Sequence, residues 1–165
     1  MARRKLPFDP IDEAARQWAQ HWSAVPQMHA VTSLMRVQQL LIGRLDEILR
    51  PHGLTFARYE ALVLLTFSRA GSLPLGKMGE RLQVHPTSVT SIVRRLEADG
   101  LVALRRHPED RRAVLAEITD AGRAVVESAT RDLVEADFGL GMLSEDSLGQ
   151  LSAVLRPVRE SAGDF

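Results

Sequence analysis

The sequence predicts a mainly α-helical protein with one small β-hairpin, and three observations carry this prediction. Apolar residues recur at helical spacing through most of the 165 residues. Two short stretches, 101–105 and 113–118, are predicted to be strands. The second of them alternates between apolar and small or polar residues, which is typical of a strand. The histidine, proline and acidic residues between them are typical of a turn.

Three helices are predicted ahead of this region. The first begins directly after Asp9, a capping residue that is followed by proline, and it carries Trp18 and Trp22 four residues apart on one face. The second spans 27–49 with apolar residues at helical spacing. The third spans 56–70 and is apolar on most sides, so we expect it to be the most buried helix.

The next two predicted helices are short and are joined by a tight turn. The first spans 75–82, and the second begins at Pro86 and ends at Gly100. One face of the second helix is apolar, and the other carries hydroxyl groups and two arginines: Thr87, Ser88, Thr90, Ser91, Arg94 and Arg95. Short hydroxyl side chains let a helix approach DNA bases and phosphates closely. Helix capping and plain solvation are the alternative explanations for these residues.

The hairpin that follows is crowded with cationic side chains, namely Arg105, Arg106, His107, Arg111 and Arg112. Folding of a turn does not require four arginines, and they repel one another when no anion is near. An arginine at a hairpin tip fits the narrow, electronegative minor groove of DNA. Asp110 lies two positions before Arg112, where its carboxylate can orient the guanidinium; a surface salt bridge is the alternative.

Two short helices joined by a turn and followed by a hairpin form a winged helix-turn-helix, whose second helix enters the major groove. We therefore predict a winged helix-turn-helix with dimerisation helices at both ends. The predicted parts of this one compact chain are an N-terminal arm at 1–10, N-terminal dimerisation helices at 11–52, the DNA-binding region at 53–119 and C-terminal dimerisation helices at 120–165.

The flanking helices are predicted to form a homodimer. Their apolar stripes are too extensive for one small winged helix to cover, and a twofold partner supplies the missing surface. Such a dimer places two recognition helices about 34 Å apart, which is one turn of DNA. An intramolecular helical bundle is the alternative.

The formal net charge is zero, but the charged side chains are unevenly distributed. Residues 77–116 carry eight basic and five acidic side chains, whereas 117–165 carry four and ten. A neutral total argues against an architectural protein that coats DNA without sequence preference, and it leaves room for one basic DNA-binding face. A winged-helix module that binds another protein is the alternative function, although its hairpin would not need the arginines.

Other classes are disfavoured by what the sequence lacks. It has no cysteine, which excludes disulfides, thiolate zinc sites, iron–sulfur clusters and thiol redox sensing. No nucleophile–base motif, phosphate-binding loop or run of metal ligands is visible, so we predict no enzyme, no cofactor and no metal site. No apolar run approaches about 18 residues and no signal peptide is evident, so we expect a cytoplasmic protein without a membrane span.

Three stretches resemble the MarR family of bacterial transcriptional regulators: LQVHPTSVT at 82–90, RLEADGLV at 95–102, and 110–122, which joins Asp-Arg-Arg to Ile-Thr-Asp-Ala-Gly. With the flanking helices, the resemblance extends over about residues 27–160. It implies a homodimer that binds a palindromic operator in double-stranded DNA.

The resemblance also implies roles for single residues. Arg112 would enter the minor groove with Asp110 as its orienting partner, and Lys77 would contact a backbone phosphate. The predicted DNA-binding residues are Lys77, Pro86, Thr87, Ser88, Thr90, Ser91, Arg94, Arg95, Arg105, His107, Asp110, Arg111 and Arg112.

Members of this family often bind a small anionic or aromatic molecule, which here would release a repressor from its operator. The additional N-terminal helix resembles the urate-responsive branch, in which a tryptophan lines the ligand pocket with an acidic residue and arginines. This sequence departs from that branch, because Ser91 and Leu104 stand where the branch has arginines. The predicted ligand-binding residues are Trp18, Arg36, Arg58 and Glu60. Packing of Trp18 at the base of the dimer is the alternative.

Overall fold

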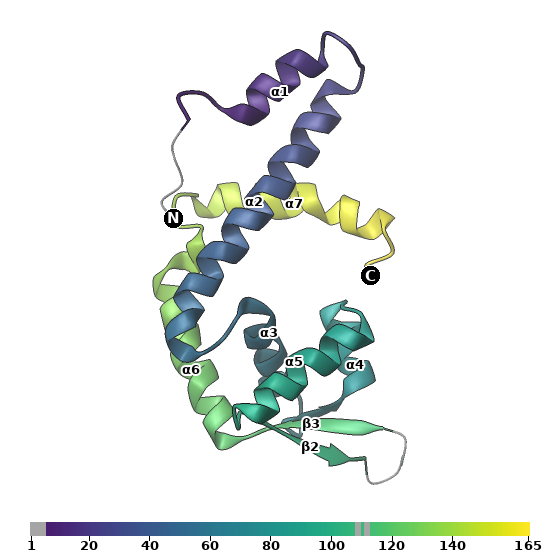
Figure 1. The fold of residues 1–165 in the computed structure, drawn as a ribbon, viewed down its shortest axis with the longest axis vertical. Helices are drawn as coiled ribbons and strands as arrows, with labels where there is room; N and C mark the ends of the chain where they lie inside the picture. The colour runs from purple at the N-terminus through teal and green to yellow at the C-terminus, as the bar shows by residue number, and fades with distance from the viewer. Residues whose placement is uncertain (1–5, 108–109, 111–112) are drawn as a thin grey trace. The chain divides into compact units, whose positions relative to one another are not determined.

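The computed structural model describes residues 6–107, 110 and 113–165, and it confirms a mainly helical fold with a small hairpin (Figure 1). In chain order the elements are α1 (Pro10–Trp18), α2 (Val25–Leu49), the 3-10 turn η1 (Arg50–His52), α3 (Phe56–Phe67), β1 (Ser72–Pro74), α4 (Leu75–Leu82), α5 (Pro86–Ala98), β2 (Val102–Arg106), β3 (Val114–Ile118), α6 (Asp120–Glu135), η2 (Asp137–Gly139) and α7 (Glu145–Ser161). Within the described ranges, no helix is long and apolar enough to cross a membrane.

The chain forms two compact units, Met1–Arg44 and Leu45–Phe165. Helix α2 begins in the first unit and ends in the second. The predicted division into an arm, two dimerisation regions and a DNA-binding region depends on partners, so it stays a prediction.

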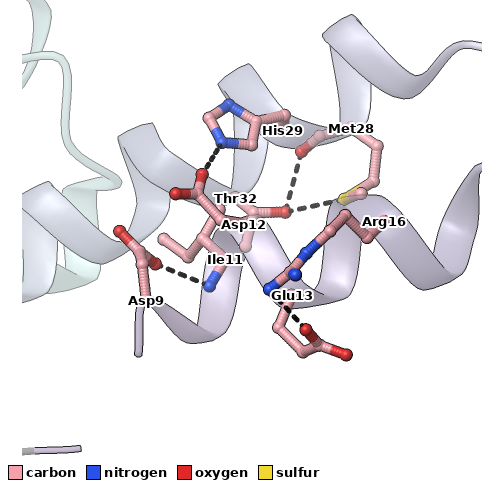
Figure 2. A network of polar contacts seen from close by, with 8 residues as sticks. All are labelled: Asp9, Ile11, Asp12, Glu13, Arg16, Met28, His29 and Thr32. Atoms are coloured by element: carbon pink, nitrogen blue, oxygen red, sulfur yellow. Dashed lines mark hydrogen bonds and ion pairs between the residues drawn. The ribbon is translucent and has the colours of Figure 1, made fainter. Parts of the chain in front are cut away.

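In the first unit, α1 begins as expected. The Asp9 side chain accepts a hydrogen bond from the Ile11 amide at 2.7 Å and thereby caps the helix. On the exposed side, His29 Nε2 of α2 lies 2.8 Å from Asp12 Oδ1 of α1 (Figure 2). This contact links α1 to α2, and the sequence pattern did not predict the contact.

The two tryptophans close the turn that links α1 to α2. Trp18 Nε1 donates a hydrogen bond to the Ser23 carbonyl oxygen at 2.8 Å, and the rings of Trp18 and Trp22 lie 4.7 Å apart. Ala24 then adopts a φ of 56°, in the left-handed region, before α2 begins. The Trp18 indole N–H is therefore engaged in a structural role.

The second unit contains the apolar core, and α3 is its central helix as predicted. Ala61, Leu62 and Leu65 of α3 are completely buried. Helix α3 packs against α5, α6 and strand β3. The largest fully buried side chains are Leu49, Leu62, Leu65, Met78, Leu96, Leu133, Val89 and Val93. Helices α4 and α5 are thus supported from one side by a shared core.

A three-stranded antiparallel sheet, in the order β1-β3-β2, forms the wing and its base. The two strands β2 and β3 confirm the predicted hairpin, with Leu104 opposite Ala116. Leu73 of β1 lies opposite Ala116 on the other side. The sequence pattern missed β1, because three residues are too few to show alternation.

Thr119 links the start of β2 to the start of α6. Its hydroxyl donates to the Gly100 carbonyl oxygen at 2.9 Å and accepts from the Gly122 amide at 3.0 Å. A Cβ atom at Gly122 would overlap the carbonyl oxygen of Leu101, so only glycine permits this close approach. The Ile-Thr-x-x-Gly stretch noted in the sequence is therefore a packing requirement.

Apolar side chains remain exposed on the helices at the two ends of the chain, as the sequence predicted. In α2 they are Val31, Leu34, Met35, Val37, Leu40 and Ile42. In and after α6 they are Val134, Phe138, Met142 and Leu143, and in α7 they are Leu151, Val154 and Val158. No residue of helix α7 is buried in this chain.

Candidate nucleic-acid interface

Helices α4 and α5 form the predicted helix-turn-helix. Helix α4 ends at Leu82, and the next residue, Gln83, has a φ of 54° and donates a hydrogen bond from its backbone N–H to the Gly79 carbonyl oxygen. A Cβ atom at Gly79 would lie 3.3 Å from Val89 of α5, so the two helices approach closely. Val89 and Val93 are buried on the inner face of α5, as the apolar pattern predicted.

The outer face of α5 gathers most of the predicted major-groove residues. They line one shallow, open hollow of about 570 Å³, and these residues are Pro86, Thr87, Thr90, Ser91, Arg94 and Arg95. Thr90 Oγ1 donates to the Pro86 carbonyl oxygen at 3.0 Å, so its methyl group and oxygen lone pairs are left for an external partner. Ser88 is exposed on the same helix but does not line the hollow.

His85, the residue directly before α5, caps the helix, and it is not among the predicted DNA-binding residues. Its Nδ1 accepts a hydrogen bond from the Thr87 amide at 3.3 Å and lies 3.1 Å from Thr87 Oγ1. The proline at the first helical position is the sequence signal that places this cap at residue 85.

The hairpin shows two kinds of arginine. Arg105 Nε lies 2.6 Å from Glu117 Oε2 on the neighbouring strand, which favours the salt-bridge alternative for this residue. Arg106 is exposed at the end of β2. The predicted wing-tip residues Arg111 and Arg112 lie outside the described residues, so their roles stay predictions.

Backbone hydrogen bonds close the hairpin close to its tip. The His107 amide donates to the Ala113 carbonyl oxygen at 3.0 Å, and the Ala113 amide donates to the Asp110 carbonyl oxygen at 3.0 Å. The Asp110 amide donates to His107 Nδ1 at 3.2 Å. His107 and Asp110 therefore shape the turn, and a contact of either with DNA remains a prediction.

This geometry matches that of known DNA-binding proteins. The sequence profile of the MarR family matches residues 57–114. A crystal structure of the MarR family transcriptional regulator Sco5413 from Streptomyces coelicolor is 59% identical, with a TM-score of 0.81, over 86% of this chain and 99% of that chain. The chain belongs to the MarR family. It is a DNA-binding transcriptional regulator, and the predicted exclusion of an enzyme agrees with this class.

Other relatives of this MarR-family regulator share the fold or the sequence. The organic hydroperoxide resistance transcriptional regulator of Bacillus subtilis (strain 168) is 33% identical over 108 residues, which is 66% of this chain and 71% of that protein. The MarR family regulator Sco3205 from Streptomyces coelicolor, crystallised with DNA, has a TM-score of 0.78 at 24% identity over 86% of this chain and 94% of that chain. The latter likeness concerns the fold alone.

Several cations of the regulator are available for an anionic partner. Lys77 is exposed in the first turn of α4, and Arg94 and Arg95 are exposed on α5. Within the part of the chain that the structure describes, these three residues make no ion pair with a carboxylate. Arg105 differs from these three residues, because it already pairs with Glu117.

The predicted ligand residues are divided between the two units. In the first unit, the Trp18 indole N–H is hydrogen-bonded to the Ser23 carbonyl oxygen. Arg36 lines a hollow of about 440 Å³, together with Leu6, Phe8 and other residues of that unit. In the second, Arg58 lies 2.9 Å from Asp99 with its side chain only 18% exposed. The common pocket therefore stays a prediction.

Arg58 and Glu60 nevertheless differ in what they can offer a ligand. The Arg58–Asp99 pair connects α3 to the residue that ends α5, so Arg58 already has a structural role. Glu60 is exposed on α3, yet partial burial of its carboxyl group raises its pKa above the usual value. No group of three or more potential metal ligands is found in the described ranges.

The last residues of the chain contact the helix-turn-helix, which no sequence signal indicated. Gln83 Nε2, in the turn between α4 and α5, donates to the Asp164 carbonyl oxygen at 2.6 Å. The Asp164 carboxylate accepts from Arg159 Nε at 2.5 Å. Arg156 and Arg159 each lie 5.0 Å from the centre of the Phe165 ring. The segment after α7 is thus held against both α7 and the turn.

Proposed function

We propose that the protein is a homodimeric repressor that binds a palindromic operator and is released from it by a small-molecule ligand. One observation carries the DNA-binding part of this proposal: the outer face of α5 presents hydroxyl groups and two exposed arginines in one open hollow, while its inner face is buried. A helix exposed in this way fits the major groove of DNA.

Within this proposal the two grooves are read by different parts. Arg94 is suited to bond a guanine, because its guanidinium matches the two acceptors of that base in the major groove. Lys77 contacts a backbone phosphate. Arg112, oriented by Asp110, enters the minor groove from the wing.

The proposed dimer is supported by the exposed apolar side chains of the flanking helices. Val154 and Val158 of α7 are 68% and 60% exposed, and Val31 and Met35 of α2 are 57% and 51% exposed. Exposed apolar residues repeated along helices are typical of association surfaces. Twofold symmetry would present two copies of α5 to successive major grooves, about 34 Å apart.

The proposed ligand is small and anionic or aromatic, with Trp18, Arg36, Arg58 and Glu60 as predicted contacts. Support comes from a relative, because CouR from Rhodococcus jostii was crystallised with p-coumaroyl-CoA; it has a TM-score of 0.65 at 25% identity over 76% of this chain and 87% of that chain. A ligand that binds the free protein more tightly than the DNA-bound protein lowers operator affinity by the ratio of its two affinities. A coupling of about 1–3 kcal/mol corresponds to about 5–150-fold.

Selection of duplexes from a random-sequence library by the wild-type protein tests the DNA-binding proposal, followed by footprinting upstream of its own gene. We expect one palindromic sequence, bound far more tightly than its scrambled version at each salt concentration. Arg112→Ala should weaken this binding sharply and leave the dimer intact, as measured by gel shift and light scattering. Equal binding of selected and scrambled duplexes would contradict the proposal and favour the protein-interaction alternative.

The repressor and ligand parts need separate measurements. A reporter gene behind the selected sequence should be silenced by the protein in cells. A panel of small carboxylic acids and phenols should contain compounds that reduce operator affinity and change tryptophan fluorescence. If the whole panel changes neither quantity, the proposed release by this class of ligand is wrong.

A further inference from the structure

The hydrogen bonds of His85 define which of its ring nitrogens carries the proton. The Thr87 amide lies 3.3 Å from His85 Nδ1, and an amide N–H can only donate. His85 Nδ1 must therefore accept, which leaves it without a proton. In the neutral ring the proton is then on Nε2, so the ring offers one N–H donor at its far edge.

This second nitrogen is available at the border of the DNA-facing hollow. The His85 side chain is exposed, and among the described residues Nε2 has no hydrogen-bond partner. Thr87, which the ring contacts through Nδ1, belongs to the lining of the hollow. The cap thus holds the ring beside the face of α5 that carries Arg94.

We propose that His85 is a further DNA-contacting residue, which donates its Nε2–H to a phosphate oxygen of the DNA backbone while Nδ1 caps α5. The inference rests on the proposed function, because it requires that α5 enters the major groove. Phosphate oxygens only accept hydrogen bonds, so they match this single neutral donor in any DNA sequence. His85 therefore positions the recognition helix and contributes no base preference.

Two substitutions separate the cap from the donor. In His85→Asn, the side-chain oxygen takes the place of Nδ1 and preserves the cap, since asparagine is a good capping residue, but the donor at Nε2 is lost. In His85→Gln, an amide N–H reaches about as far as Nε2, but the cap is lost. His21→Asn is the matched control, because His21 is an exposed histidine of the first unit that makes a ring contact with Trp22.

The full-length variants are compared by affinity for the duplex selected by the wild-type protein and for a scrambled duplex, at several salt concentrations. We expect His85→Asn to bind both duplexes about tenfold more weakly, because a hydrogen bond to a charged phosphate is lost. The loss should be the same at every salt concentration, because a neutral donor displaces no counterion from DNA. Its melting temperature should equal that of the wild type. His85→Gln should lose less affinity and melt at a lower temperature, and His21→Asn should bind as the wild type does.

A long-range ¹H–¹⁵N spectrum of the wild-type protein reports the protonated ring nitrogen directly, and we expect an unprotonated Nδ1 for His85. A protonated Nδ1 overturns the inference, as does wild-type affinity in His85→Asn or equal weakening in both His85 variants. These results leave the proposed function intact, provided that the wild-type protein selects a DNA sequence. If it selects none, the proposed function fails and the inference fails with it.

Discussion

Two arginines of the proposed DNA-binding region differ in whether they already have a partner. Arg105 Nε lies 2.6 Å from Glu117 Oε2, so binding a phosphate through this group means giving up an existing partner. Arg94 lines the hollow on α5 and makes no ion pair with any described carboxylate. Because its guanidinium keeps all its donors for the base edges, Arg94 is the residue on which we expect base preference to depend most.

Arg94→Ala should relax base preference at one symmetric position of each half-site. The loss of discrimination should be about 1–3 kcal/mol at that position, since a bidentate contact with a base is removed. Affinities for duplexes that vary one base pair at a time measure this effect. Arg105→Ala is the control, and it should change affinity without a position-specific effect; an unaltered base preference in Arg94→Ala would remove Arg94 from the set of reading residues.

Gly122→Ala should destabilise the fold. The new methyl group would overlap the Leu101 carbonyl oxygen and press on Ile118, so we expect a loss of about 1–3 kcal/mol in the free energy of unfolding. Gly149→Ala in α7 is the matched control, because nothing lies within 4 Å of its Cβ position. That change should stabilise by about 0.5–1 kcal/mol through helix propensity, and urea unfolding of both variants measures the difference. Equal stability of the two variants would show that the approach at Gly122 is not close.

The elements that the sequence predicted well are those whose signals are local. Helix α5 begins at a proline, buries one apolar face and ends before a glycine, and each of these features lies within the helix or next to it. Strand β1 has three residues and exists because it pairs with β3, so its own residues carry little signal. The contact between Gln83 and Asp164 joins residues 81 positions apart, and no periodicity indicates it.

In the candidate site, too, local features could be predicted from the sequence, whereas tertiary contacts could not. The hydroxyl groups and arginines of α5 could be assigned from helical spacing, because one face of a helix is fixed by its period. The engagement of Arg58 with Asp99 and of Arg105 with Glu117 depends on tertiary contacts, so the sequence alone left these cations as candidates for a ligand or for DNA.

Gln83→Ala should loosen the turn between α4 and α5. The substitution removes the hydrogen bond to the Asp164 carbonyl oxygen, which contributes about 1 kcal/mol, so amides of the turn should exchange with solvent about fivefold faster. Hydrogen exchange followed by mass spectrometry measures this. Gln150→Ala is the control, because it removes an exposed hydrogen bond to Asp146 within α7. Unchanged exchange at residues 83–87 would mean that the segment after α7 does not restrain the turn.

At the scale of the whole molecule, apolar surface is distributed unevenly. The core of the second unit is well buried around α3, whereas α7 has no buried residue and α2 buries only Leu45 and Leu49. A protein of this size does not usually leave two long helices so exposed. This distribution is expected if the fold is complete only when a second copy binds.

The double substitution Val154→Glu and Val158→Glu should dissociate the proposed dimer. Charged side chains at these exposed apolar positions would have to be buried on association, which we expect to weaken the dimer by at least about 3 kcal/mol, or about a hundredfold. Sedimentation at several concentrations measures the effect. Ser152→Glu, on another side of α7, should leave the dimer intact. A dimer unaffected by the double substitution would place the interface elsewhere.

Thr119 also has a mechanical consequence. One hydroxyl group bonds both the carbonyl oxygen of Gly100, two residues after the end of α5, and the amide of Gly122, in the first turn of α6. If α6 slides or tilts, these hydrogen bonds must either pull the end of α5 with it or break. In the proposed complex, a ligand that moved α6 would therefore also change the angle at which α5 meets DNA.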